Sequence, residues 1–126
     1  MEAVSDINIE LVRWRLDLAQ ARAALASANI ANVHTAGYTA RRLDFASQVE
    51  RLRQGFEGNG AEAALREVRA EGFSPEPRLP QNLLGASVNL DDEIVQLVDA
   101  GARYRALTAM LNRHFGLMRL AISSRG

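Results

Sequence analysis

The sequence lacks cysteine and lysine, and its three prolines all lie between positions 75 and 80. Without cysteine the chain can form no disulfide, no thiolate nucleophile and no cysteine-ligated metal site, so the fold must depend on packing. Fifteen acidic side chains balance fifteen arginines, which argues against a nucleic-acid binder that relies on net positive charge. No apolar run approaches the length of a membrane span.

Sequence patterns typical of catalysis are also missing. There is no phosphate-cradling glycine loop, nucleophile elbow or metal-spaced cluster. His34 and His114 are the only histidines, and neither has a carboxylate at ligand spacing. We therefore expect no enzyme activity, no cofactor, no metal and no small-molecule substrate. The first residues lack a basic region followed by an apolar core and predict no cleaved secretory signal.

The N-terminal part carries apolar residues at alternating steps of four and three. This spacing is a heptad seam, typical of a helix that packs against another helix. Alanines are frequent toward its end and combine high helix propensity with small volume. The pattern predicts a helix from about Asp6 to Asn32, with these seam residues: Ile7, Leu11, Trp14, Leu18, Ala21, Leu25 and Ala28.

The C-terminal part repeats the same spacing over a longer stretch. Asn89 is placed to cap the predicted helix, acidic residues open it, and arginines lie toward its end, which complements the helix dipole. The seam predicts a helix from residue 89 to near the end of the chain, through Leu90, Ile94, Leu97, Gly101, Tyr104, Thr108, Leu111, Phe115, Met118 and Ile122.

The segment 41–88 has a different composition. Short helices are predicted at about 44–54 and 61–70, and glycines and prolines interrupt any longer element. We find no strand-like alternation and expect little core within this segment. We interpret it as a flexible, poorly structured middle.

These segments predict an all-α fold in which two long terminal helices form an antiparallel coiled-coil hairpin with their apolar seams facing one another. The domain organisation is then 1–40 for the N-terminal helix and turn, 41–88 for the middle and 89–126 for the C-terminal helix, with both ends forming one structural domain. The arrangement also brings Glu2, Asp6 and Glu10 near the arginine-rich end of the second helix. Apolar residues off the seams would stay exposed and need a partner: Leu16, Ile30, Val95, Val98, Leu107, Met110, Leu117 and Leu120.

The residues that follow the first helix form a candidate turn motif. Asn32 and Gly37 suit backbone positions with positive φ, and the polar side chains can hold the exiting chain. An ordinary helix end is the simpler interpretation of this pattern. The turn motif consists of Asn29, Asn32, Thr35, Gly37 and Tyr38.

The string from Ala28 to Tyr38 also resembles the signature that follows the N-terminal helix in flagellar axial proteins of the rod and hook. It departs at Ala36, where that family usually carries proline, and at His34, where a small polar residue is commoner. The C-terminal helix is similar to the proximal-rod member of the flagellar basal-body rod protein family in three strings: Arg103-Tyr104, Leu111-Asn112-Arg113 and Gly116-Leu117-Met118-Arg119-Leu120-Ala121-Ile122.

This resemblance implies a structural subunit of the proximal rod that self-assembles through its terminal helices. It implies a place in the periplasmic rod of the basal body and export without a cleaved signal through the flagellar export apparatus. The implied partners are other copies of the chain, other rod proteins and the basal-body adaptor at the membrane ring. The predicted assembly interface consists of Leu11, Trp14, Leu18, Leu25, Leu97, Tyr104, Leu111, Phe115, Met118 and Ile122.

Two other functions fit the helical pattern. A soluble coiled-coil adaptor or chaperone would use the same seams to fold as a closed oligomer. A peripheral membrane protein would instead lay an amphipathic helix on a lipid surface. A discrete oligomer would favour the first of these, and binding to lipid would favour the second.

Overall fold

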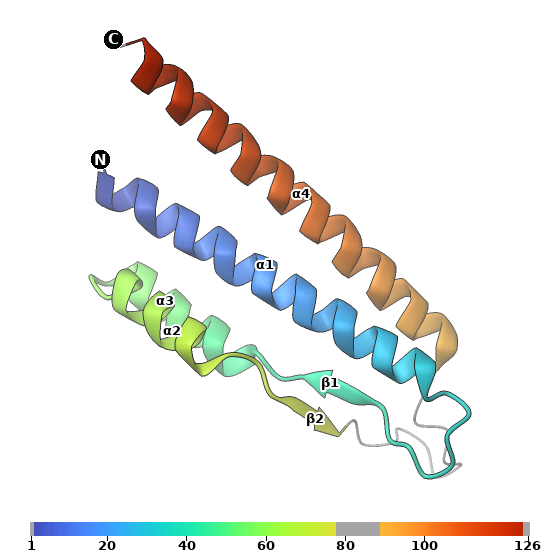
Figure 1. The fold of residues 1–126 in the computed structure, drawn as a ribbon. Coiled ribbons are helices and arrows are strands. Elements are labelled where there is room, and N and C mark those ends of the chain that lie inside the picture. The colour runs from blue at the N-terminus through green and yellow to red at the C-terminus, as the bar shows by residue number, and fades with distance from the viewer. Residues whose placement is uncertain (1, 78–88, 125–126) are drawn as a thin grey trace.

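The computed structural model describes residues 2–77 and 89–124, and most of them are helical (Figure 1). Helix α1 spans Glu2–Ala31 and helix α4 spans Leu90–Ser123. The two run antiparallel and pack against each other, so the predicted all-α class and terminal hairpin are confirmed. Asn89 caps α4 as predicted, because its side chain accepts hydrogen bonds from the backbone N–H groups of Asp91 and Asp92.

The middle of the chain forms a second helical hairpin. Helix α2 spans Ala46–Glu57 and helix α3 spans Ala61–Glu71, close to the two predicted short helices. Two short strands, β1 (Arg41–Leu43) and β2 (Pro75–Pro77), pair antiparallel and hold the hairpin's ends together. The strands were not predicted, since three residues are too few to show alternation. The rest of the middle segment, 78–88, lies outside the described residues.

The main apolar core lies between α1 and the α2–α3 hairpin. Trp14 of α1 is buried in it, and its indole N–H donates to Oε1 of Gln48, whose own amide donates to the carbonyl of Gly72. The residues of this core cluster are Trp14, Leu52, Leu65 and Val68, with Ile7, Leu11, Leu18, Ala64 and Phe73 packed around them. The middle segment is thus more structured than its sequence suggested, because its few apolar residues are spaced to face α1.

This core changes the predicted pairing of the seams. The N-terminal half of the α1 seam faces α2 and α3, whereas the expectation was that it faces α4. The face of α1 that carries Val12 borders α4 instead, and the buried alanines Ala19 and Ala26 follow Val12 at steps of seven on that face. Ala100 and Glu93 are the buried residues of α4. Alanines on facing helices allow their backbones to approach closely.

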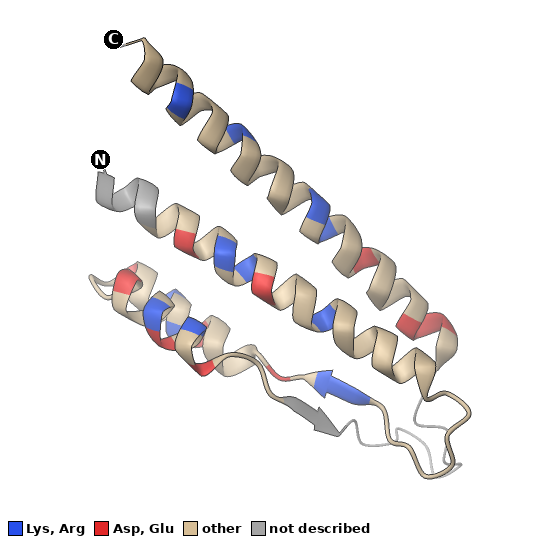
Figure 2. Cartoon of the chain, viewed as in Figure 1, with Lys and Arg blue, Asp and Glu red and all other residues tan. Residues whose placement is uncertain are grey.

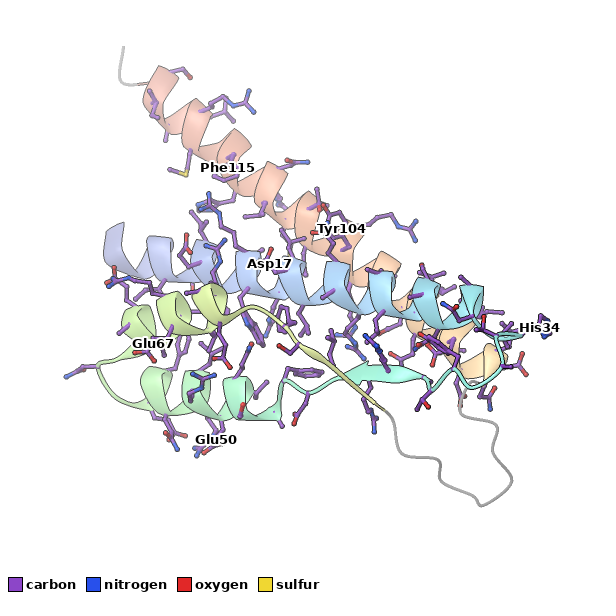
Figure 3. All side chains as sticks on the ribbon, turned by 60° about the horizontal axis from the view of Figure 1, so that its bottom comes forward. Asp17, His34, Glu50, Glu67, Tyr104 and Phe115 are labelled. Carbon is purple, nitrogen blue, oxygen red and sulfur yellow. The ribbon has the colours of Figure 1, made fainter. Side chains whose placement is uncertain are left out.

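The two long helices separate toward the chain termini, as Figures 1 and 3 both show. Several seam residues in the second half of α4 therefore remain uncovered. Phe115 is 39% exposed, Met118 is 44% exposed and Ile122 is 70% exposed. In a closed hairpin, α1 would cover these three residues of α4.

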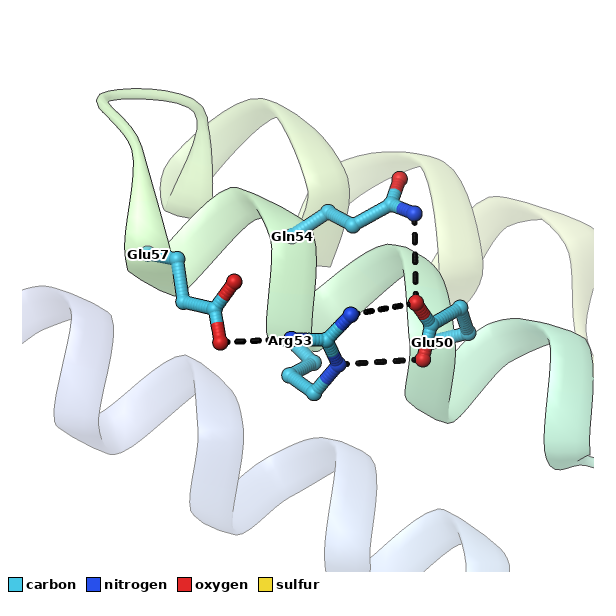
Figure 4. Close-up of polar contacts among 4 residues, drawn as sticks. All are labelled: Glu50, Arg53, Gln54 and Glu57. Carbon is cyan, nitrogen blue, oxygen red and sulfur yellow. Dashed lines mark hydrogen bonds and ion pairs between the residues drawn. The ribbon is translucent and has the colours of Figure 1, made fainter.

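Acidic and basic residues are frequent along α2 and α3 (Figure 2). On α2, Arg53 lies between Glu50 and Glu57 and pairs with both (Figure 4). The hydrogen bond from Arg53 lowers the pKa of the Glu50 carboxyl.

Glu10 of α1 pairs with Arg69 of α3 and not, as expected, with an arginine of α4. The side chains of Glu2 and Asp6, expected at the same place, lie outside those that the structure describes. The α2–α3 hairpin takes the position beside Glu10 that the prediction gave to α4.

Candidate functional site

The most connected polar residue of the turn motif is Asn29, in the last turn of α1. Its side chain is 1% exposed, yet each of its hydrogen-bonding positions is used. The amide nitrogen donates to the Arg41 carbonyl at 2.9 Å and to Oε2 of Glu93 at 3.1 Å. The amide oxygen accepts from the Tyr38 hydroxyl at 2.8 Å and from the Arg41 backbone N–H at 3.1 Å.

These bonds join three parts of the chain that lie far apart in sequence. Arg41 is the first residue of β1, and Glu93 lies in the first turn of α4. Asn29 therefore fixes where β1 leaves α1 and where α4 begins beside it. A buried amide costs free energy unless its donors and acceptors are paired, so the position selects this one arrangement of the three elements.

The rest of the turn motif shapes the chain between α1 and β1. The side chain of Asn32 donates to the Ala28 carbonyl, and Thr35 donates to the Asn32 side chain. Gly37 has φ of 77°, in the left-handed region that disfavours other residues. The expected positive φ at Asn32 is wrong, because its side chain satisfies the helix end while the backbone keeps negative φ.

The predicted assembly residues divide into two groups. In α1, Leu11, Trp14 and Leu18 belong to the core with α2 and α3, while Leu25 is half-buried beside Arg41. In α4, Leu97 and Leu111 are half-buried, and the remaining residues are exposed: Tyr104, Phe115, Met118 and Ile122. Figure 3 shows Tyr104 and Phe115 on α4 where it separates from α1. Part of the predicted set thus serves the subunit's own core.

An apolar cavity of about 410 Å³ opens where the two long helices diverge. Ile9 and Val12 of α1 and Leu111 and Leu117 of α4 line it. His114 also borders this cavity, and its Nε2 atom is buried without a hydrogen-bond partner among the described residues. The lining suits apolar side chains.

The described residues hold no group of three or more histidine, aspartate or glutamate side chains placed to bind a metal ion. None of the helices in this part of the chain is long and apolar enough to cross a membrane.

Comparison with known proteins identifies the family. The chain is 30% identical to "Flagellar basal body rod protein FlgB" of Escherichia coli (strain K12), over 90% of this chain and 91% of that one. The chain belongs to the FlgB family. It is also 31% identical to the FlgB protein of Salmonella typhimurium over the same shares of the two chains. The FlgB protein of Yersinia ruckeri is 30% identical over 82% of this chain and 85% of its own. No protein-family model matches the sequence.

Membership of the FlgB family agrees with the resemblance seen at both ends of the sequence. Sequence reasoning missed the partners of Asn29, because Glu93 was interpreted only as a charge that complements the helix dipole. It also missed the buried positions Ala19 and Ala26, because the seam was traced through Ala21 and Ala28 instead. The spacing of seven between Ala19 and Ala26 is a signal that the sequence does contain, whereas the burial of Glu93 is visible only in the structure.

Proposed function

We propose that this chain is a structural subunit of the proximal flagellar rod. It joins neighbouring subunits through the open end of the α1–α4 hairpin, where the two chain termini lie. The observation that supports the proposal is the exposed apolar surface formed by Phe115, Met118 and Ile122. The relatives that this chain matches are named flagellar basal body rod proteins. A rod subunit needs a surface of this kind, because its helices must pack against other subunits.

Burial of this surface can supply substantial free energy. Each large apolar side chain that moves from water into a contact contributes roughly 1.5 to 3 kcal/mol when it is fully buried. These residues begin partly exposed, so several of them must be covered together to offset the cost of association. A helical neighbour fits this requirement, since the seam has helical spacing.

The same proposal includes the binding partners of the subunit and its location in the basal body. The subunit would contact other copies of itself, other rod proteins and the basal-body adaptor at the membrane ring. It would lie in the periplasmic rod and reach it through the flagellar export apparatus without a cleaved signal. We further propose that the two ends, 1–40 and 89–126, act as one structural domain, to which the α2–α3 hairpin of the middle segment 41–88 is attached beside α1.

A soluble coiled-coil adaptor is the second candidate, favoured by the antiparallel hairpin itself. An adaptor of this kind would be active in the cell without entering the basal body. Fractionation of cells separates the two, because only a rod subunit co-purifies with isolated basal bodies. A peripheral membrane protein would be recovered with lipid vesicles.

The experiment compares two single substitutions of exposed apolar residues. Ile122→Asp places a carboxylate in the proposed contact, whereas Val49→Asp makes the same kind of change on α2. We expect Ile122→Asp to abolish swimming in a strain that lacks the native gene and to be absent from isolated basal bodies. Val49→Asp should retain at least half of the parental swimming rate. Equal swimming by both variants would show that the proposed contact is wrong.

A further inference from the structure

Helix α4 carries a second line of exposed residues, of which Arg113 and Leu117 also border the cavity beside α1. The two end residues of this line, Val95 and Leu120, are 64% and 66% exposed. At 100° per residue the line lies on nearly the opposite side of α4 from the buried Ala100. All of its members are exposed, and we call it the outer stripe: Val95, Val98, Ala102, Ala106, Ala109, Arg113, Leu117 and Leu120.

The outer stripe has a different period from the contact with α1. Val95, Ala106 and Leu117 are eleven residues apart, whereas the buried residues Glu93 and Ala100 are seven apart. An eleven-residue repeat stays close to a straight line along the helix, so the stripe forms one continuous face. One helix thus has two packing faces, and the chain uses one of them internally.

The spacing of the stripe is the same from either end, and Ala102 takes the position that corresponds to Arg113. The successive steps are three, four, four, three, four, four and three residues, with alanines in the middle and larger residues at both ends. A second copy laid antiparallel therefore sets Val95 opposite Leu120, Val98 opposite Leu117, and Ala106 opposite Ala109. The alanines permit close approach of the two helices at the centre, while the larger residues fill the space toward the ends.

The charges of α4 favour the same orientation. Acidic residues lie toward the start of the helix, and none follows Asp99 in the sequence (Figure 2). Arg105, Arg113 and Arg119 have no ion-pair partner among the residues that the structure describes. An antiparallel pair brings the acidic end of each helix to the basic end of the other, and Arg113 lies within one turn of the second copy's Asp99. A parallel pair in register would place like charges together.

We propose that the unassembled subunit forms a two-fold dimer through the outer stripes of antiparallel α4 helices. Each stripe covers the other, so the pair is closed and does not extend into a filament. The dimer protects the stripe in solution and must separate if that face is needed in an assembly. This inference concerns the free chain and does not depend on the proposed role in the rod.

Cysteine crosslinking of the full-length chain tests the register, because the native sequence has no cysteine. Val98→Cys and Leu117→Cys proteins are purified separately, mixed and oxidised. We expect a disulfide-linked dimer in the mixture and little in either protein alone, since the two positions are about 28 Å apart along one helix. A mixture of Val49→Cys with Leu117→Cys is the matched control and should give no crosslink above background.

Sedimentation equilibrium of the uncrosslinked chain tests the association itself. We expect a monomer–dimer equilibrium, and we expect Arg113→Asp to raise its dissociation constant at least tenfold. A chain that stays monomeric at all concentrations would overturn the proposal. Crosslinking of Val98→Cys to itself would also overturn it, because it indicates a parallel pair. Growth of open-ended oligomers, or a monomer that floats with anionic vesicles, would overturn it as well, because each gives the stripe a different partner.

Discussion

Asn29 shows how one short side chain can determine the path of a whole chain. Its amide has two donors and its carbonyl has two acceptor positions, and the structure fills all of them from Tyr38, Arg41 and Glu93. No other natural side chain offers this combination at this length, since aspartate lacks the donors and glutamine is longer. The end of α1 therefore depends on the identity of this residue.

Asn29→Ala should reduce the free energy of unfolding by roughly 2 to 4 kcal/mol, because it removes four hydrogen bonds and leaves partly buried backbone groups of Arg41 without their partner. Asn32→Ala is the control, since its side chain makes only local bonds to Ala28 and Thr35. We expect it to lose at most about 1 kcal/mol. Urea denaturation followed by circular dichroism measures both. Equal losses would show that the buried network contributes no more than an exposed turn.

At the scale of elements, the α2–α3 hairpin is held by a close approach of its helices. Gly55 of α2 faces α3 so closely that an added Cβ would lie 2.9 Å from Cβ of Ala64 and 3.0 Å from the carbonyl oxygen of Gly60. Because one of these atoms belongs to the backbone, the helices must move apart to accept any larger residue. Glycine at this position sets the separation of α2 and α3.

Gly55→Ala should therefore destabilise the protein by about 1 to 2 kcal/mol, since the clash exceeds the gain in helix propensity. Gly58→Ala changes the same residue type just beyond α2, where the nearest atom lies at 3.6 Å. We expect the control to change stability by no more than about 0.5 kcal/mol. Differential scanning calorimetry of both variants gives the comparison. A stable Gly55→Ala protein would mean that the hairpin can open without cost.

The elements differ in how far the sequence alone could predict them. Helices α1 and α4 follow from periodicity, and α2 and α3 from short patterns between glycines. The β1–β2 pair could not be predicted, because its pairing joins Arg41 to Pro77 across the whole middle segment.

The covered face of α4 was predicted in part, because Leu97 and Leu111 of the seam are half-buried. The fully buried residues of α4, Glu93 and Ala100, lie outside the predicted seam. Of the turn motif, local chemistry predicted the positive φ of Gly37 and the use of polar side chains to hold the exiting chain, but not the partners of Asn29.

The whole molecule has its elements arranged around α1. The α2–α3 hairpin covers one face of its N-terminal half, and α4 packs along another face toward its C-terminal end. The two halves of α1 therefore depend on different neighbours. Loss of α4 should release one half and spare the other.

A chain that ends at residue 88 lacks α4 and tests this dependence. We expect backbone amides of residues 22–31 to exchange with deuterium at least tenfold faster than in the full chain, because their packing and the Asn29 contact to Glu93 are lost. Amides near Trp14 should keep most of their protection. A chain that ends at Gly116 keeps the contact and is the control. Uniform exchange along α1 would contradict separate support for its halves.

The bond between Asn29 and Glu93 also has a consequence in time. The two residues are 64 positions apart, so the end of the first helix is completed by a residue that is made much later. A ribosome delivers the chain from its N-terminus, and during synthesis Asn29 must wait for most of the protein before its amide is satisfied. A product that terminates before Glu93 would form the bonds of Asn29 to Tyr38 and Arg41 but would leave one donor of its amide without this carboxylate.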